Sequence, residues 1–313
     1  MSTLLEAENL SVRYPGKAGW VHAVSEVSLE LRAGETLGLV GESGCGKSTL
    51  GKALMRLIPA QGALRLNGSD VLGVEGRKLL PFRRQVQMMF QDPQGSLNPR
   101  QRIGTSIARP LQVAGWSRSA IAARVSELLE EVGLPASAAT RFPHEFSGGQ
   151  RQRIGIARAL ALEPGIVICD EPVSALDVSV RAQVINLMRD IQQRSQVAYL
   201  FISHDLSVVE YIAHRVLVMY LGRVVESGPT AQIWASPAHP YTRALLAAAP
   251  VADPRHSRSD ALLEGELPSP LSPPSGCAFH TRCPYAQAIC RQQRPALQAL
   301  SPERQVACHF SLS

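Results

Sequence analysis

Short apolar runs alternate with amphipathic segments along this chain, as expected for a sheet covered by helices. Near the N-terminus, three strand-like segments show partial apolar alternation, and the third ends in a glycine-rich turn: Leu4–Tyr14, Val24–Leu31 and Glu35–Val40. Ile166–Cys169 and Ala198–Ile202 are short and wholly apolar, which is typical of central strands buried on both faces. The pattern predicts an α/β fold.

Helical periodicity fills the space between these strands. The spacing predicts helices over Ser119–Val132, Gln150–Leu162 and Asp177–Arg194. The first two lie in a mostly helical insert that we place at about residues 92–163.

The chain has 313 residues with 45% hydrophobic content, enough for one large domain and an appendage. After about residue 235, repeated prolines interrupt regular patterns, and the stretch reads as a linker. The tail from Gly276 to Ser313 is too short to bury a core of its own without a staple. We therefore predict a domain over residues 1–235 and an extension over residues 236–313.

Several function classes receive no support from charge and hydropathy. No stretch approaches the roughly 20 apolar residues of a membrane-spanning helix, and the N-terminus does not resemble a signal peptide. The net charge of +6 is spread along the chain without a long basic run, so nucleic-acid binding is not indicated. We expect a protein of the cytosol.

A phosphate loop follows the third predicted strand. Gly41-Glu-Ser-Gly-Cys-Gly-Lys47-Ser48 has the pattern Gly, four residues, Gly-Lys-Ser, and a helical segment follows it. Glycines let backbone N–H groups curl around phosphate oxygens, Lys47 reaches the β- and γ-phosphates, and Ser48 binds Mg²⁺. An ordinary glycine turn is the alternative, but it explains neither the Lys-Ser pair nor the strand-to-helix context. The candidate ATP-binding residues here are Gly41, Glu42, Ser43, Gly44, Cys45, Gly46, Lys47, Ser48 and Thr49.

Two carboxylates end the apolar strand Ile166–Cys169. The strand delivers Asp170 to the carboxyl edge of the sheet, where ligands of α/β proteins collect, and this position suits a Mg²⁺ ligand. Glu171 can turn into the site as the general base for the attacking water. On its own, the pair could equally be a solvated strand end; the phosphate loop favours the catalytic interpretation.

A second anion-binding helix start distinguishes this chain from other nucleotide-binding proteins. Ser147-Gly148-Gly149-Gln150 places a capping serine and two glycines at the beginning of a predicted helix. One chain has no evident need of two phosphate cradles. We infer that these residues complete the site of a facing copy, so that two nucleotides lie between two such domains.

With these motifs in this order, residues 1 to about 235 resemble the nucleotide-binding subunit of ATP-binding-cassette (ABC) transporters. The resemblance implies a P-loop core of the ABC ATPase type with an antiparallel β subdomain and an inserted helical subdomain. It implies that Gln91 senses Mg²⁺ and the attacking water, that Asp177 lies in a loop crossing the dimer interface, and that His204 contacts the γ-phosphate. Tyr14 matches the aromatic that stacks on adenine, with Trp20 as an alternative nearby. Lys47, Gln91, Glu171 and His204 are thereby the catalytic candidates, and Ser48, Gln91 and Asp170 the Mg²⁺ ligands.

The tail resembles the C-terminal extension of dipeptide, oligopeptide and nickel importer ATPases, through His239-Pro-Tyr-Thr242, Gly265–Pro270 and Gly276-Cys-Ala-Phe. Some members hold a [4Fe-4S] cluster at four cysteine positions, matched here by Cys277, Cys283, Cys290 and Cys308. Zinc with His280 or His309 replacing one thiol, and reduced cysteines without metal, stay open as alternatives.

The family resemblance implies the ATP-hydrolysing subunit of a bacterial importer for peptides, at the cytoplasmic face of the inner membrane. The implied partners are two transmembrane permease subunits, a second cassette that is a paralogue or an identical copy, and, indirectly, an extracytoplasmic binding protein. An importer of nickel or another small solute, and a soluble cassette ATPase without a transport role, are the alternatives.

Overall fold

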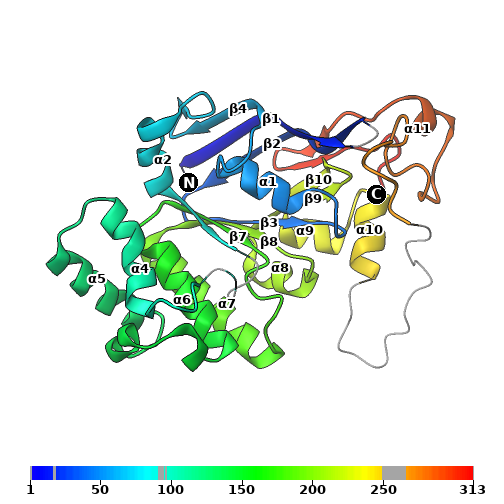
Figure 1. The fold of residues 1–313 in the computed structure, drawn as a ribbon. Coiled ribbons are helices and arrows are strands. Elements are labelled where there is room, and N and C mark those ends of the chain that lie inside the picture. Colours follow the sequence, from blue (N-terminus) through cyan, green and yellow to red (C-terminus); the bar gives the residue numbers. More distant parts are fainter. Residues whose placement is uncertain (1, 17–18, 91–94, 96, 249–265, 313) are drawn as a thin grey trace. The chain divides into compact units, whose positions relative to one another are not determined.

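The computed structural model describes residues 2–16, 19–90, 95, 97–248 and 266–312 (Figure 1). The chain forms two compact units. The first contains residues 1–4, 31–35 and 66–200, and the second contains residues 5–30, 36–65 and 201–313. Strand β8 (Ala198–Ile202), whose five residues are all buried, carries the chain from the first unit into the second. The domain boundary expected near residue 235 stays a prediction.

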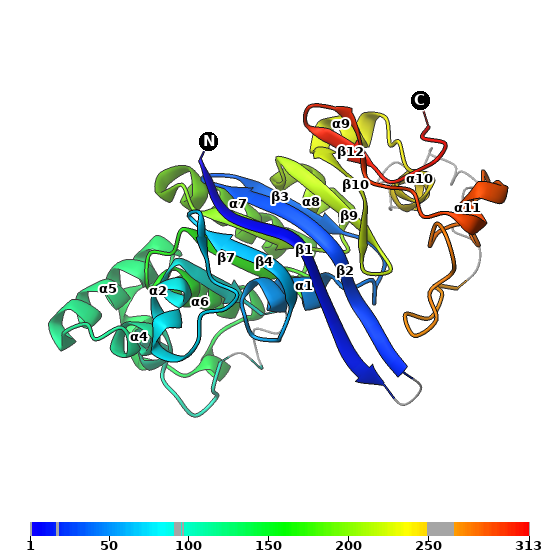
Figure 2. The same ribbon diagram turned by 90° about the horizontal axis from the view of Figure 1, so that it is seen from above.

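The second unit contains strands of two sheets. Strands β2 (Gly19–Arg32), β1 (Thr3–Gly16) and β4 (Gln61–Leu66) are neighbours in that order, and Figure 2 shows β1 and β2 as two long adjacent strands. β3 (Thr36–Val40) pairs in parallel with β9 (Arg215–Tyr220), with Leu37 opposite Arg215 and Val40 opposite Val218. All five β3 residues are buried, as its unbroken apolar character requires.

The helices of the second unit are short. They are α1 (Lys47–Leu54), α8 (Leu206–Ile212), α9 (Thr230–Ala235), α10 (Pro240–Ala247) and α11 (Ala288–Gln292).

The first unit contains the helical insert and two parallel strands, β6 (Val86–Met89) and β7 (Ile166–Asp170). A short strand β5 (Ser69–Asp70) precedes them. The helices are η1 (Gly76–Leu79), α2 (Leu80–Gln85), α4 (Ile103–Val113), α5 (Arg118–Glu131), η2 (Ala136–Thr140), η3 (Pro143–Glu145), α6 (Gly148–Leu160) and α7 (Val178–Ser195). Among the described residues, none of the helices is both long and apolar enough to span a bilayer.

The elements expected from hydrophobic spacing are present, and most of their ends move by one or two residues, as is usual. The exception is β2, which begins at Gly19, five residues before the expected Val24. The stretch after residue 235 differs, because helix α10 begins there. Pro240 occupies its first turn, where a missing N–H costs nothing, and Nδ1 of His239 caps the helix by accepting the N–H of Tyr241 at 3.0 Å. The stretch expected to be a linker therefore begins with a helix.

The tail obtains its core by extending the sheet of the second unit. β10 (Arg223–Pro229) pairs antiparallel with β9, and β12 (Arg304–Val306) pairs antiparallel with β10, followed by β11 (Gln298–Ser301). Figure 1 shows the orange and red tail gathered beside β10 and α10. A short tail therefore buries residues such as Phe279 and Val306 without a core of its own.

A buried carboxylate fixes this arrangement. Glu226 of β10 is fully buried and accepts the backbone N–H groups of Ala238 and His239, each at 2.9 Å. Its Oε1 also receives Nη2 of Arg304 from β12 at 2.8 Å. One side chain thus joins β10, the start of α10 and the tail hairpin.

Replacing Glu226 with Ala should lower the free energy of unfolding by about 3–5 kcal/mol, because it leaves two buried N–H groups without their acceptor and a largely buried guanidinium without its carboxylate partner. Glu26→Ala is the matched control: its carboxylate also pairs with an arginine, but its side chain is 60% exposed, so we expect a loss below about 1 kcal/mol. Urea unfolding of both variants measures the difference. Similar losses would contradict the role given to Glu226.

Candidate functional site

The phosphate loop can be built only with glycine at two positions. Gly41 has φ 149°, and a Cβ there would lie 2.2 Å from the carbonyl oxygen of Met219. Gly46 has φ 105°, and its Cβ would lie 2.1 Å from the carbonyl oxygen of Ala23. Both the backbone conformation and the close approach exclude any other residue. The loop is therefore seated directly against neighbouring backbone.

The loop presents positive charge at the start of α1. Lys47 is 6% exposed, and its Nζ donates to the carbonyl oxygens of Gly41 at 2.8 Å and Glu42 at 2.9 Å. The first turn of α1 contains no acidic residue, and no side chain caps its N-terminus. Backbone N–H groups, the helix dipole and an ammonium thus converge, which is the donor set that phosphate groups require. The residues present fit a nucleoside triphosphate.

Two residues that sequence reasoning missed also hold this loop. Arg282 forms a bidentate ion pair with Glu42, with Nη1 to Oε2 at 2.7 Å and Nη2 to Oε1 at 3.0 Å. The backbone N–H of Glu42 donates to the hydroxyl of buried Tyr241 at 2.8 Å. No local sequence signal connects residues 240 and 199 positions apart, so these contacts could not be found from spacing.

Two further candidates lie in the same unit. Tyr14, near the end of β1, is 37% exposed, so it is not a core aromatic. Trp20, the alternative, is 57% exposed and has the guanidinium of Arg13 5.9 Å from its ring centroid. His204 is exposed and follows β8, immediately before Asp205, which caps α8 by accepting the N–H of Val208 at 3.3 Å. The adenine and γ-phosphate contacts of Tyr14 and His204 stay predictions.

The carboxylate pair lies in the first unit, at the end of β7. Asp170 is 4% exposed and ends the strand. Glu171 has a left-handed φ of 48°, which is unfavourable for a side chain of this kind by about 1–3 kcal/mol. Such strain concentrates at functional positions, and it turns Glu171 out of the strand that ends at Asp170. Because Lys47 belongs to the other unit, the approach of Asp170 to the loop stays a prediction.

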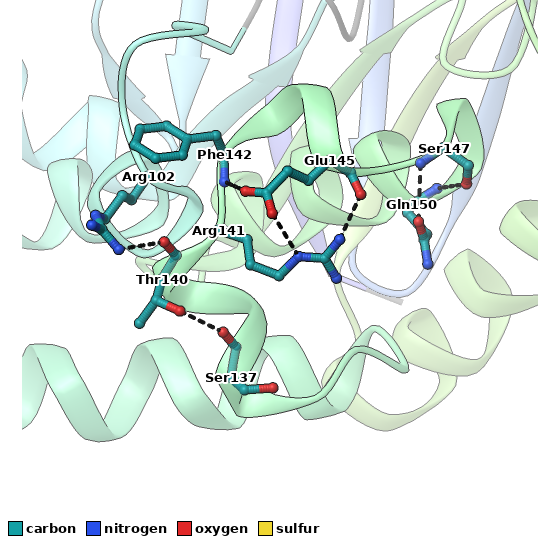
Figure 3. A network of polar contacts seen from close by, with 8 residues as sticks. All are labelled: Arg102, Ser137, Thr140, Arg141, Phe142, Glu145, Ser147 and Gln150. Atoms are coloured by element: carbon teal, nitrogen blue, oxygen red, sulfur yellow. Dashed lines mark hydrogen bonds and ion pairs between the residues drawn. The ribbon is translucent and has the colours of Figure 1, made fainter.

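The predicted serine cap of α6 is present as a capping box (Figure 3). The N–H of Gln150 donates to Oγ of Ser147 at 3.3 Å, and the N–H of Ser147 donates to Oε1 of Gln150 at 3.0 Å. This reciprocal pair fixes where the helix begins. It also fixes the direction of the N-terminal end of α6, which begins with Gly148 and Gly149.

The segment that leads into this helix is held by its own side chains (Figure 3). Glu145 accepts the N–H of Phe142 at 2.6 Å, a contact that lowers the pKa of its carboxyl, and it pairs with Nε of Arg141 at 3.4 Å. Arg141 also donates to the carbonyl of Glu145 at 2.7 Å and lies 4.5 Å from the ring centroid of buried Phe146. The turn before Ser147 is thereby cross-linked.

The serine-glycine-glycine segment lies beside the loop that contains Asp177. A Cβ on Gly149 would lie 2.3 Å from Cγ1 of Val180 in α7, and one on Gly148 would lie 3.7 Å from Cδ2 of Leu176. Gly149 is therefore required for close helix packing. The structure therefore places the candidate residues 147–150 next to the loop of Asp177. The side chains of Ser147 and Asp177 are both exposed. Gln91 lies outside the described residues.

The four tail cysteines line one small cavity of about 10 Å³, together with His239 and Phe279. Burial raises the pKa of Cys277 to about 11 and also raises the pKa values of Cys283 and Cys308. Among the described residues, no group of three or more His, Cys, Asp or Glu side chains is arranged to hold a metal ion. The described residues therefore give no support to the predicted cluster or zinc site.

A basic groove in the first unit was also missed. It has a volume of about 390 Å³ and lies along α2 and α4. Four arginines line it with apolar side chains between them: Arg83, Arg84, Arg109 and Arg158. The arginines are dispersed over three helices, so no basic run marks them in the sequence.

Comparison with known proteins identifies this combination of features. Residues 24–174 match the family model of the ABC transporter, and residues 225–290 match that of the oligopeptide/dipeptide transporter, C-terminal region. The di/tripeptide transport ATP-binding protein DppF of Pseudomonas aeruginosa is 50% identical, over 99% of this chain and 98% of its own. The oligopeptide transport ATP-binding protein AppF of Bacillus subtilis is 50% identical, over 98% and 97% respectively.

Solved structures agree on the fold. The dimeric ATP-binding cassette MJ0796, in a post-hydrolysis state bound to ADP and Pi, superposes with a TM-score of 0.66 at 25% identity, covering 72% of this chain and 99% of its own. CbiO1 of Clostridium perfringens gives a TM-score of 0.68 at 24% identity, over 75% and 92%. The predicted cassette fold is confirmed.

The buried histidine of the tail cavity generates a pH prediction. His239 is 1% exposed, and burial lowers its pKa from 6.5 to about 4. Between these values the unfolded chain binds a proton that the folded chain does not, so stability falls as the pH falls from about 6.5 towards 4. At pH 5 the loss amounts to about 2 kcal/mol relative to pH 7.5.

His239→Gln retains an acceptor for the Tyr241 N–H and removes the titrating group. The loss of unfolding free energy between pH 7.5 and pH 5 should therefore be smaller in this variant than in wild type. Exposed His22, changed to Gln, is the control and should leave the pH dependence of the wild type unaltered. Parallel pH curves for His239→Gln and wild type would contradict the prediction.

Proposed function

The chain belongs to the ABC transporter family of ATPases, and from this premise we propose that it is the ATP-hydrolysing subunit of an importer of peptides. The observation that carries the proposal is that the resemblance to peptide transport ATP-binding proteins extends over both the cassette and the C-terminal region. An ABC ATPase of another kind would resemble these relatives over the cassette but not over the C-terminal region.

In the proposed mechanism, the loop from Gly41 to Thr49 binds the phosphates of ATP. Lys47 exchanges its contacts with the carbonyls of Gly41 and Glu42 for the β- and γ-phosphate oxygens. Ser48, Asp170 and Gln91 would hold Mg²⁺, which neutralises charge on the phosphates when bound. The buried position of Asp170 supports this role for its carboxylate.

Glu171 is the proposed general base. It accepts a proton from the attacking water, while His204 contacts the γ-phosphate and orients it for in-line attack. The left-handed backbone at Glu171 supports the assignment, since strain of this kind persists where a side chain must point in a set direction. Tyr14 is the proposed adenine contact.

A facing cassette completes each nucleotide site. Ser147, Gly148 and Gly149 of one chain contact the phosphates bound by the other, with Asp177 beside them at the interface. The capping box and the cross-linked turn before it support this, because they present the start of α6 as a rigid, exposed surface. The second cassette is a paralogue or an identical copy. Neither alternative is favoured by the contacts described.

The basic groove is the proposed docking surface for a permease subunit. Its mixture of arginines with Leu80, Pro110 and Leu162 suits an acidic amphipathic segment, and burial lowers the pKa of Arg158, as expected for a partly desolvated cation. Two permease subunits in the inner membrane would then hold the cassettes at its cytoplasmic face. An extracytoplasmic binding protein would deliver the peptide.

Two alternative functions can be distinguished from peptide import by experiment. An importer of nickel or another small solute would share every feature of the cassette, so substrate uptake by the assembled transporter decides between them. A soluble cassette ATPase without transport would fail to copurify with permease subunits. A metal at Cys277, Cys283, Cys290 and Cys308 stays a prediction that metal analysis of the purified chain decides.

Replacing Glu171 with Gln should lower kcat for ATP hydrolysis about 100-fold or more, because the carboxylate that accepts the proton is lost. ATP binding should persist and stabilise a dimer. Phosphate release and gel filtration with ATP measure these outcomes.

Glu163→Gln is a matched control for Glu171→Gln. It also replaces a glutamate at positive φ, only shortly before β7, but its side chain is 69% exposed and pairs with Arg124. It should hydrolyse ATP as wild type does. Retained hydrolysis in Glu171→Gln would remove this residue as the base.

Reversing a charge in the groove should separate docking from hydrolysis. Arg109→Glu is expected to reduce copurification of permease subunits at least about tenfold, while the ATPase rate of the isolated chain stays unchanged, because like charges then face each other. Arg118→Glu, exposed on α5 and outside the groove, is the control. Equal permease recovery in the two variants would place docking elsewhere.

A further inference from the structure

The first residue after Gly41 is held through three of its polar groups. The side chain of Glu42 receives both terminal nitrogens of Arg282, at 2.7 and 3.0 Å. Its N–H donates to the hydroxyl of Tyr241 at 2.8 Å, and its carbonyl oxygen accepts Nζ of Lys47 at 2.9 Å. One residue of the phosphate loop thus links the catalytic lysine to α10 and to the tail.

The ion pair is partly shielded from water, unlike the surface pairs of this unit. The side chain of Arg282 is 5% exposed and that of Glu42 is 25% exposed, whereas in the pair of Arg294 with Glu26 the two are 55% and 60% exposed. The contact with Glu42 raises the pKa of Arg282 above its ordinary value, so the guanidinium stays charged. A bidentate guanidinium–carboxylate pair fixes direction as well as distance.

Arg282 is itself held in place by its surroundings. Its N–H donates to the carbonyl of Phe279 at 3.0 Å, and its guanidinium carbon lies 6.0 Å from the ring centroid of Tyr220. Phe279 is 1% exposed and contacts Tyr220 and Tyr241 with ring centroids 5.3 and 5.4 Å apart. The turn before Arg282 is closed by the N–H of His280, which donates to the carbonyl of Cys277 at 3.0 Å, and Cys277 is itself tied to α11 by its N–H, which donates to the carbonyl of Cys290 at 2.8 Å. The geometry of the cysteine-lined tail therefore sets where the guanidinium lies.

These contacts form a continuous path from the tail to the phosphate-binding lysine. A displacement of Arg282 would release the Glu42 side chain and, with it, the backbone of the phosphate loop between Gly41 and Lys47, whose shape the phosphates need after Lys47 has turned to them. Arg282 reaches the phosphate loop at Glu42, the loop residue whose carboxylate accepts both of its terminal nitrogens.

We propose that Arg282 is a positioning residue for ATP binding, by which the C-terminal extension holds the phosphate loop in its binding conformation through Glu42. This inference rests on the proposed ATPase function and names a regulatory input to that site. A change in the packing of the tail, from any cause, is read out as a change in affinity for ATP.

The test compares full-length Arg282→Gln with wild type. Kd for Mg-ATP, measured with a fluorescent ATP analogue, and KM should both rise about fivefold or more, the lower range of typical couplings between sites. The value of kcat should change less than about twofold, since Arg282 contacts no reacting atom. Arg282→Lys, which keeps the charge, should recover part of the affinity.

The coupling to Glu42 is tested by a double-mutant cycle. If Arg282 acts through Glu42, the double variant Glu42→Gln/Arg282→Gln should bind ATP no more weakly than the weaker single variant. Additive losses would overturn the proposal. Arg294→Gln, which removes an exposed cation of the same tail, is the matched control and should bind ATP as wild type does.

The outcomes distinguish a failure of the Arg282–Glu42 contact, called the clamp below, from a failure of the proposed ATPase function. If wild type binds ATP and Arg282→Gln retains that affinity, the clamp is wrong and the ATPase function stands. A wild type without nucleotide binding contradicts both. If Arg282→Gln fails to fold, Glu42→Gln breaks the same ion pair from the side of the loop, and an unchanged Kd for Mg-ATP in that variant contradicts the proposed role of Arg282.

Discussion

The close approach of the phosphate loop to neighbouring backbone is the constraint on which the second unit depends. Gly41 and Gly46 lie so near the carbonyls of Met219 and Ala23 that no Cβ fits between them. Hydrogen bonds continue the contact, since the N–H of Gly222 donates to the carbonyl of Cys45 at 2.8 Å. The loop is consequently positioned by β2 and by the turn between β9 and β10, and small shifts of either would be transmitted to it.

The tail uses the same turn region as its anchor. Tyr220 ends β9 next to that turn, and its ring contacts Tyr241 at 4.7 Å and Phe279 at 5.3 Å between centroids. Buried Glu226 and Arg304 fasten the tail hairpin to β10, the other strand of the turn. The extension therefore packs against the elements that seat the phosphate loop. This shared support is why one of its arginines reaches a residue of the loop.

Features defined by local sequence were predictable, and those defined by distant contacts were not. The glycine loop, the buried strand before Asp170 and the serine cap of α6 follow from spacing and capping rules, and the structure has them. Arg282 and Tyr241 lie 240 and 199 positions from Glu42, and the groove arginines come from three helices, so no local pattern contained them. The expectation of a linker after residue 235 did not include α10, which begins at Pro240, because a proline that breaks a helix interior is favoured in the first turn. The four tail cysteines suggested a metal site, but ligation depends on how the side chains are oriented in the fold, and their spacing in the sequence does not determine this.

Rigidity inside each unit has a consequence for how the energy of nucleotide binding is used. Ordering a flexible loop costs about 0.5–1.5 kcal/mol for each side chain immobilised, and binding energy spent in that way cannot drive association. Here Glu42 is held by Arg282 and Tyr241 before nucleotide enters, and the turn before Ser147 is held by Arg141 and Glu145. Both segments are therefore ordered in advance. In the proposed mechanism, the free energy of ATP binding then remains for closing two cassettes on each other, which is the movement that a transport motor delivers to its membrane partner.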